Sequence, residues 1–359
     1  MLFYIIVVGI TLFFGAWAAR YDEPVASTLK VGRFRHTRTC KSLFIISSLI
    51  LIFVSGLRYY VGTDFGAYYR QYAKYADSLW TRLETLDEPG YALVASVARV
   101  LVDDGWMSIF LSSLLITGLV LATIYKHTDT IFFSLAFYIF LGAWHGSFNG
   151  TRQYMATAVL FAGLPFLLNR KFVPYCITVF LAFLCHKSAI IMVLLYFVVY
   201  REINFKNLMI TILLTWIVSI AYEYLFTISS LILDDEASFN EFTLQGVSII
   251  RIAVYSLPAI FFWLFLSRQE LNKIDTFMGN LLTVFSALSI ITMQSSFLQR
   301  IILYLVPFQT LAIPHMFRMI KGKTQQYASA ISLILYAAFW MYDISVRSNM
   351  IPYRWIGQR

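Results

Sequence analysis

Charged residues are scarce in this sequence. Asp, Glu, Lys and Arg make up 13% of its 359 residues, and apolar residues make up 59%. Soluble domains carry about 25% charged residues, so this composition supplies too little polar surface for a soluble chain of this length. Apolar runs recur from end to end, which indicates a single polytopic membrane domain over residues 1–359. The net charge of +9 then reflects basic cytoplasmic loops, and no nucleic-acid partner is expected.

The sequence also lacks the motifs by which enzymes bind nucleotides or nucleotide-activated sugars. The sequence has no Gly-rich nucleotide loop, no Walker motif and no Asp-rich motif of the kind that nucleotide-sugar transferases use to hold a metal. Its three cysteines, Cys40, Cys176 and Cys185, lie in or beside apolar runs without metal-ligand spacing, which favours packing roles. An enzyme of this kind that works outside the cell must use an activated substrate already in the membrane.

The sequence instead offers a series of apolar runs. A spanning helix needs roughly 20 residues, so several runs must borrow flanking residues. The first run lacks the basic flank and cleavage site of a signal peptide. We predict an all-α integral membrane protein with about twelve transmembrane helices. The runs are 2–19, 42–57, 106–125, 130–145, 153–168, 172–185, 188–200, 207–230, 247–267, 277–293, 301–317 and 326–342.

Basic residues predict which loops face the cytoplasm. Residues 20–41 form the densest basic loop and are expected inside. The N-terminus, the segment 58–104 and the acidic loop 231–246 are then external. Residues 90–104 are apolar but short, and the later basic loops fall inside only if this stretch is a re-entrant or interfacial helix.

The orientation of the later helices depends on residues 172–200. Basic residues flank this stretch at both ends, which favours a helical hairpin whose turn at His186 and Lys187 faces outward. One long helix is the alternative, and it would invert everything that follows.

Polar residues gather at the ends of these runs, on the predicted external side. Ionisable groups at membrane depth are costly, and they mark a pathway, a site or an internal pair. The residues concerned are Arg58, Asp64, Tyr68, Glu88, Asn149, Arg152, Gln153, His186, Ser188, Arg251, Gln299 and Arg300.

Three of these residues predict an anion site. Asn149, Arg152 and Gln153 have i, i+3, i+4 spacing, which places them on one face of a helix. They also lie at its start, where free N–H groups favour an anion. Arg300 likewise opens a run, and Arg58 closes one. Arginine suits a diphosphate because its planar fork donates paired hydrogen bonds; a lipid headgroup is the alternative ligand.

His186 and Asp64 are the candidate bases for a hydroxyl substrate, with Glu88 behind them. Each also has a simpler interpretation, since His186 can be a satisfied turn residue and Asp64 can pair with Arg58. Tyr68 lies on a tyrosine stripe that suits either sugar stacking or the membrane interface.

Five short motifs, taken in order, resemble the EpsG family, whose members are Wzy-type polymerases of bacterial exopolysaccharide and O-antigen. The resemblance covers roughly residues 50–310. The motifs are GLRYYVGTDFGAYY (56–69), EPGY (88–91), NGTRQ (149–153), HKSA (186–189) and QR (299–300).

The resemblance implies polymerisation of undecaprenyl-diphosphate-linked oligosaccharides by an enzyme of the bacterial inner membrane, with its active side facing the periplasm or exterior. It implies a fold like that of the membrane glycosyltransferases that use lipid-linked donors, and a chain-length regulator as a possible partner. Arg152 and Arg300 would stabilise the leaving diphosphate, and His186 or Asp64 would act on the acceptor. No metal is expected, because guanidinium groups supply the positive charge. The substrate contacts would be Arg58, Tyr68, Glu88, Asn149, Gln153, Ser188, Arg251 and Gln299.

Two other functions remain open at this stage. A flippase for the same lipid-linked unit would line a path through both halves of the membrane with polar residues, whereas here they cluster on one side. A membrane O-acyltransferase would use His186 as its base, and contact between His145 and His186 would favour it.

Overall fold

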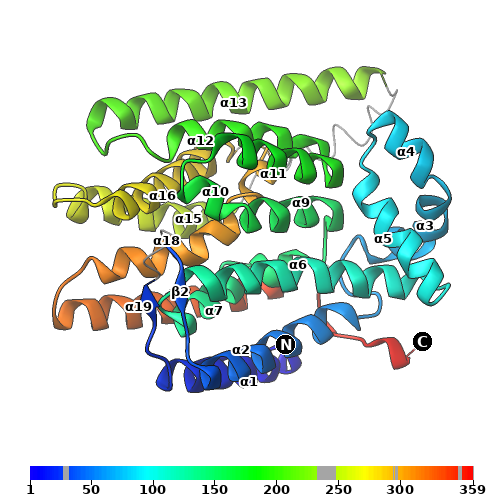
Figure 1. Cartoon of the computed structure of the whole chain (residues 1–359), viewed down its shortest axis with the longest axis horizontal. Helices are drawn as coiled ribbons and strands as arrows, with labels where there is room; N and C mark the ends of the chain where they lie inside the picture. Colours follow the sequence, from blue (N-terminus) through cyan, green and yellow to red (C-terminus); the bar gives the residue numbers. More distant parts are fainter. Residues whose placement is uncertain (27–31, 233–247, 294, 296–297, 347–349, 359) are drawn as a thin grey trace. The chain divides into compact units, whose positions relative to one another are not determined.

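The computed structural model describes residues 1–26, 32–232, 248–293, 295, 298–346 and 350–358. Within them the protein is helical apart from one two-stranded sheet (Figure 1). The chain forms two compact units. The first unit comprises Met1–Ile190 and Ser332–Arg359, and the second comprises Ile191–Ile331. The predicted acidic loop 231–246 lies almost wholly outside the described residues.

The elements follow one another in this order: α1 Leu2–Arg20, β1 Val25–Ala26, β2 Phe34–Arg35, α2 Arg38–Gly56, α3 Phe65–Asp77, α4 Leu79–Thr85, α5 Pro89–Leu101, α6 Gly105–His127, α7 Ile131–Phe140, α8 Ala143–Gly146, α9 Thr151–Ala162, α10 Leu164–Leu168, α11 Phe172–Cys185, η1 Lys187–Leu194, α12 Leu195–Val198, α13 Phe205–Ile232, α15 Ile249–Phe261, η2 Phe262–Leu266, α16 Lys273–Ile291, α17 Arg300–Leu303, α18 Val306–Arg318, α19 Lys323–Val346 and η3 Ile356–Gln358.

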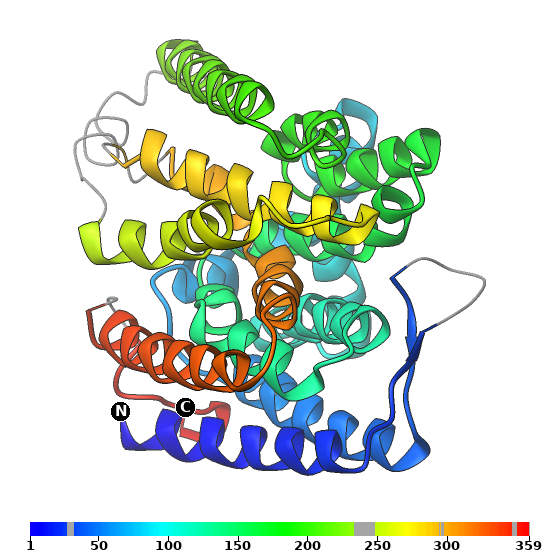
Figure 2. The same cartoon turned by 90° about the vertical axis from the view of Figure 1, so that its left-hand side faces the viewer.

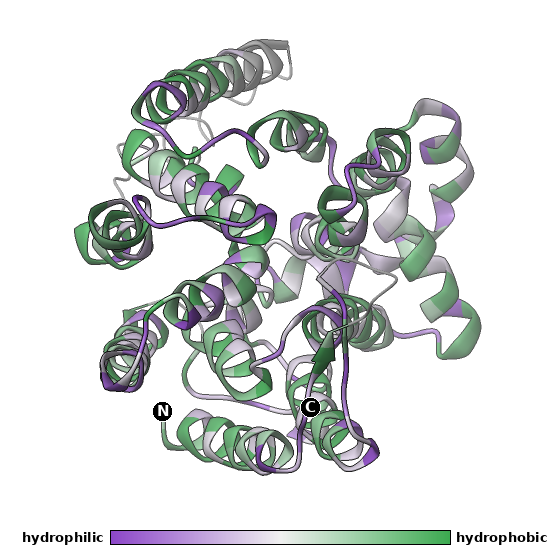
Figure 3. Ribbon diagram, turned by 60° about the vertical axis from the view of Figure 1, so that its left-hand side comes forward, coloured by the Kyte–Doolittle hydropathy of each residue, from purple (hydrophilic) through white to green (hydrophobic). Residues whose placement is uncertain are grey.

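The helices have the hydropathy of an integral membrane protein. Figure 3 shows hydrophobic residues along most helices and hydrophilic residues mainly in the connections. Among the described residues, six helices are long and apolar enough to span a bilayer. The all-α membrane class is therefore confirmed, but the count of about twelve spans is not. The six are α1, α2, α6, the continuous α15–η2 stretch, α16 and α19.

Several predicted runs are broken into shorter helices. The run 153–168 is divided into α9 and α10 at Gly163, and 301–317 is divided into α17 and α18. A proline near the start of α10 and of α18 explains why each begins a new helix, since proline lacks the N–H that the preceding turn would use. The stretch 172–200 is not one continuous helix, because His186 is extended, with φ −157°.

In the first unit, α1 packs along α2, α2 packs on α6, and α6 packs on α9, which in turn contacts α11. The strands β1 and β2 pair antiparallel where the chain passes from α1 to α2 (Figure 2). The side chain of Thr37 accepts a hydrogen bond from the N–H of Cys40 and so caps the start of α2.

The helices α3 and α5 pack against α6, and α4 packs against α3 and α5 (Figure 1). Asp104 caps the start of α6, because its side chain accepts a hydrogen bond from the Trp106 N–H at 3.1 Å. One side of α5 packs on α3 and α6, and its other side exposes Leu93, Val97 and Val100. An apolar outer face on a 13-residue helix is what an interfacial or re-entrant helix requires, although its place in the bilayer stays a prediction.

The C-terminal residues run alongside the end of α2. The N–H of Tyr59 donates to the Arg354 carbonyl at 2.9 Å, and the N–H of Ile356 donates to the Leu57 carbonyl at 2.8 Å. The Tyr353 hydroxyl adds a bond to a carbonyl of α2 at 2.9 Å. These bonds hold the segment that leads to the candidate site.

In the second unit, α16 packs against α13, α15 and α18. Asn272 and Asp275 form a capping box at the start of α16. Asp275 also pairs with His315 of α18 at 2.8 Å, so one carboxylate both caps its own helix and joins it to a neighbour.

Gly62 provides a test of the packing between the loop after α2 and the turn before α9. Its φ is +94°, and a Cβ there would meet the Phe148 carbonyl oxygen at 2.7 Å and the Asn149 side chain at 2.8 Å. We therefore expect Gly62→Ala to destabilise the protein by about 1–3 kcal/mol, seen as a lower melting temperature in detergent. Gly118→Ala is the matched control, because its Cβ would meet nothing within 4 Å. Equal melting temperatures for the two variants would contradict this packing.

Candidate functional site

The carboxylate of Glu88 joins three segments that are far apart in the sequence. Glu88 directly precedes α5, Arg152 lies in the first turn of α9, and His186 follows α11. All three belong to the first unit. We refer to Glu88, Arg152 and His186 as the Glu88 cluster.

Each oxygen of the Glu88 carboxylate has its own donors. Oε2 accepts from Arg152 Nη1 at 2.5 Å. Oε1 accepts from the Nδ1 of His186 at 2.7 Å and from the backbone N–H of Lys187 at 2.9 Å. Glu88 itself is only 6% exposed, so these donors replace the water that an ionised carboxylate would otherwise bind.

These contacts control the ionisation of Glu88. Burial is the largest influence and opposes ionisation, but the hydrogen bond and charge of His186 and the charge of Arg152 outweigh it. The pKa of Glu88 therefore falls from 4.5 to about 2, and the carboxylate is charged at physiological pH.

Local backbone conformations present these groups to one another. Glu88 adopts a left-handed conformation with φ 50° immediately before Pro89, the first residue of α5. His186 is extended and ends α11, which frees the following N–H to donate to Glu88 instead of continuing the helix. Lys187 also pairs through Nζ with Asp87 at 2.6 Å, so two consecutive acidic residues hold the turn after α11.

The contact with Glu88 selects one tautomer of His186. A carboxylate can only accept, so Nδ1 must carry the proton that it donates. In the neutral imidazole, Nε2 is then an acceptor. The His186 side chain is 26% exposed, so an imidazole oriented by a carboxylate is partly accessible to solvent.

Arg152 keeps donors for a ligand after meeting its protein partners. Its Nη1 binds Glu88, and its Nε donates to the Tyr68 hydroxyl at 3.4 Å. The guanidinium lies over the Tyr75 ring at 5.8 Å. A guanidinium has more N–H donors than these contacts use, and this side chain is 32% exposed.

A second set of contacts joins the loop after α2 to the turn before α9. The Asn149 side-chain oxygen accepts from the Thr63 N–H at 2.7 Å and from its hydroxyl at 3.0 Å. The Asp64 carboxylate accepts from the Gly150 N–H at 2.6 Å. The prediction that Asn149 shares a helix face with Arg152 is therefore wrong, because Gly150 has φ +61° and α9 begins only afterwards.

Arg58 is buried, at 3% exposure, and its donors contact the protein itself. It donates to the Ser55 carbonyl, to the Val61 carbonyl at 3.3 Å and to the Ser113 hydroxyl at 3.0 Å. It also contacts the Phe148 carbonyl at 3.4 Å and lies over that ring. A cation near the last carbonyls of α2 is favourable. These contacts make Arg58 a support for the loop after α2. The hydrogen bonds of Arg58 named above do not include Asp64, whose carboxylate binds the Gly150 N–H instead.

The remaining predicted residues are dispersed. Gln153 is 5% exposed within α9, and Ser188 is half-buried in η1. The others belong to the second unit: Arg251 is in α15, Gln299 precedes α17, and Arg300 begins it. Gln299 donates to the Ser289 carbonyl at 3.0 Å. Because α17 has only four residues, the expected long helix behind Arg300 is wrong. Any approach of these three residues to the Glu88 cluster stays a prediction.

The central position of Glu88 was missed by sequence reasoning, which ranked it behind His186 and Asp64. Tyr75 of the tyrosine stripe and Tyr91 of the EPGY motif had no predicted contact with each other; Tyr91 packs edge-on against Tyr68 and Tyr75, with ring centroids 4.8 and 4.9 Å apart. The available signal was the acidic pair Asp87-Glu88 immediately before a proline that starts a helix.

The two histidines relevant to acyl transfer use different carboxylates. His145 pairs with Asp343 at 3.0 Å, and His186 pairs with Glu88. His145 is fully buried, whereas His186 is partly exposed. This arrangement gives no support to an acyltransferase site in which His145 and His186 act together.

Replacing the central carboxylate tests its supporting role. Glu88→Gln keeps the size of the side chain but removes the charge that pairs with Arg152, so we expect a loss of about 1–3 kcal/mol at neutral pH. Because the pKa of Glu88 is lowered, its contribution is complete above pH 4.5 and disappears as pH falls toward about 2. The difference in melting temperature between wild type and variant should therefore shrink below pH 4.5. Exposed Glu84 of α4 provides the control, Glu84→Gln; a gap that is independent of pH would contradict this interpretation.

Comparisons with known proteins agree with the motifs in this site. The family model described as "EpsG family" matches residues 41–355, nearly the whole chain and the entire span of the Glu88 cluster. No curated protein and no solved structure matches. The chain belongs to the EpsG family, a family of Wzy-type, polymerase-like proteins.

Proposed function

We propose that this protein polymerises lipid-linked oligosaccharides in a bacterial cytoplasmic membrane. The growing chain would leave its undecaprenyl diphosphate and join the non-reducing end of the next repeat unit, on the external face. The observation that carries the proposal is the Glu88 cluster, in which one carboxylate orients both a partly exposed arginine and a partly exposed histidine. Family membership supports a polysaccharide polymerase in coarser terms.

The reaction needs an electrophilic partner for the leaving group. The glycosidic C–O bond to the diphosphate breaks, and its electron pair stays on the phosphate oxygen. The free N–H groups of Arg152 would bind that oxygen and stabilise the developing charge. Tyr68 and Glu88 already hold the guanidinium in place, so little reorganisation is needed when the charge appears.

The reaction also needs an acceptor for one proton. The hydroxyl of the incoming unit forms a bond to the anomeric carbon, and its proton would pass to Nε2 of His186. Glu88 would stabilise the imidazolium that results, since it already accepts from Nδ1. Asp64 is partly exposed and remains the alternative base, but its carboxylate binds the Gly150 N–H, which favours a role in shaping the turn.

A group of aromatic residues in the first unit suits a sugar. Tyr59, Tyr60, Phe65 and Tyr69 form a group of rings with centroids 4.9–6.2 Å apart. Tyr60 is 42% exposed, so this group has an outer face available for stacking. Contacts of Arg251, Gln299 and Arg300 with the lipid-linked substrate, predicted from the sequence, are part of the same proposal.

The first experiment concerns Arg152 in the cell. Deleting the gene should collapse the ladder of surface polysaccharide to single repeat units. Wild type should restore the ladder and Arg152→Ala should not, at equal protein level in the membrane. Arg99→Ala is the control, because Arg99 is an exposed arginine of the same unit that pairs with Asp77. A full ladder with Arg152→Ala would refute the proposed role, and repeat units retained inside the cell would indicate a flippase.

The second experiment asks whether His186 acts as the base or only supports the turn after α11. Purified protein in liposomes, supplied with lipid-linked repeat units, should lose activity about 100-fold or more with His186→Ala, as expected for removal of a general base. Lys187→Ala should retain most activity, since Lys187 meets Glu88 through its backbone N–H and its side chain is 55% exposed. Similar rates for His186→Ala and wild type would move the base to Asp64.

A further inference from the structure

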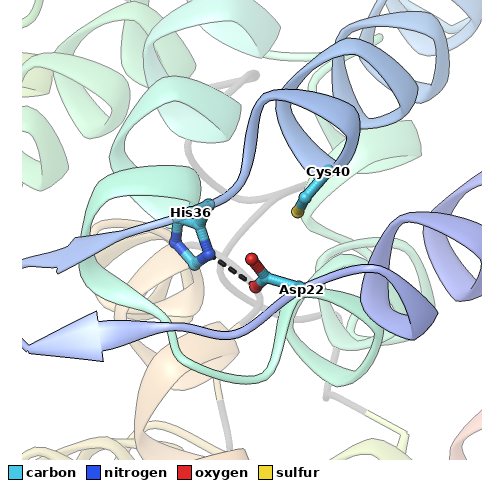
Figure 4. A group of neighbouring side chains, drawn as sticks. All are labelled: Asp22, His36 and Cys40. Atoms are coloured by element: carbon cyan, nitrogen blue, oxygen red, sulfur yellow. Dashed lines mark hydrogen bonds and ion pairs between the residues drawn. The ribbon is translucent and has the colours of Figure 1, made fainter.

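A second cluster of reactive side chains lies outside the Glu88 cluster, where the chain leaves α1 and enters α2. Figure 4 shows Asp22, His36 and Cys40 directed toward one another. Asp22 follows α1, His36 follows β2, and Cys40 is in the first turn of α2. The short sheet of β1 and β2 brings these residues together, which sequence spacing did not reveal.

The geometry of this cluster is compact and dry. His36 Nδ1 and Asp22 Oδ2 are 2.6 Å apart, and one ligand atom from each of the three residues lies within 4.8 Å of the others. The side chains of His36 and Asp22 are 0% and 4% exposed, and Cys40 is fully buried. Within the described part of the chain, buried His36 Nε2 has no hydrogen-bond partner.

We propose that Asp22, His36 and Cys40 form a binding site for a thiophilic divalent metal ion, for which zinc is the best match. The three side chains supply one oxygen, one nitrogen and one sulfur, the set of donor atoms that zinc uses. Zinc–ligand bonds of about 2.0–2.3 Å separate the ligands of a tetrahedron by about 3.5 Å, so atoms within 4.8 Å need only small side-chain rotations.

Binding exchanges a proton for the ion. The ion replaces the thiol proton of Cys40, which passes to solvent, and the proton on His36 Nδ1 moves to Nε2 so that the neutral imidazole binds the ion. Three protein ligands leave a fourth position for water. Affinity should therefore rise with pH, because protons compete for the same atoms.

The local fold does not need the Cys40 side chain. The start of α2 is capped through the backbone N–H of Cys40 and the Thr37 hydroxyl, and the turn is held by the bonds of His36 and Thr37 to Asp22. The Cys40 side chain itself interacts with Asp22 and makes none of these bonds. The Tyr125 ring lies 4.6 Å from the His36 ring and holds it in the orientation seen in Figure 4.

The ion would tie the end of α1 to the start of α2. None of its three ligands belongs to the Glu88 cluster, so the metal would stabilise the fold and take no part in sugar transfer.

Cobalt(II) provides the direct test, because thiolate ligation gives it a charge-transfer band in the near ultraviolet. Protein purified without a histidine tag should bind one cobalt and show this band, and zinc should abolish it. Cys40→Ser should lose the band, because it removes the thiolate. It should weaken zinc binding by more than the roughly 10–100-fold that follows the loss of a residue that only supports a ligand. Cys185→Ser is the matched control, since Cys185 is also a buried cysteine near a helix end, and it should keep the band.

A second measurement needs no variant. A chelator should lower the melting temperature of wild-type protein, and zinc should restore it, with a larger effect at pH 8 than at pH 6. Wild type without a cobalt band, or Cys40→Ser with an unchanged band, would overturn the proposal, as would a melting temperature indifferent to both zinc and chelator. Activity in liposomes is a separate readout, so failure here leaves the proposed polymerase function standing.

Discussion

The burial of the Glu88 carboxylate constrains the first unit more than any other single contact. An ionised carboxylate at 6% exposure is stable only if donors surround it. The chain supplies them from the start of α9 and from the break after α11. Those two segments must therefore meet at the start of α5. This contact fixes how α5, α9 and α11 are arranged where their ends meet.

The same requirement explains why polar contacts collect where helices end. Buried Arg58 satisfies its guanidinium with carbonyls from the end of α2 and from the turn before α9, and Asn149 and Asp64 join that turn to the loop after α2. Helix interiors have already satisfied their backbone groups, whereas their ends have not. Breaks at Gly150 and His186 thus create the free groups that build the site.

Charge balance gives the Glu88 cluster a chemical property that fits the proposed reaction. Arg152 pairs with Glu88, and Lys187 pairs with Asp87, so these four residues are balanced while His186 is neutral. Transfer of a proton to His186 would add one positive charge as negative charge develops on a departing diphosphate. In the proposed reaction, this charge change would favour the transition state over the ground state.

Composition and apolar runs by themselves determined the membrane class, because hydropathy does not depend on which helices become neighbours. The ordered motifs determined the family, and Arg152, His186 and Glu88 were all among the polar residues predicted from their positions at the ends of apolar runs. Only tertiary structure placed Glu88 at the centre, turned Arg58 inward and moved Asn149 off the helix of Arg152. It alone also brought Cys40 beside Asp22 and His36. These outcomes depend on left-handed turns, helix breaks and contacts between distant segments, and such contacts arise from packing, which the local pattern of residues does not contain.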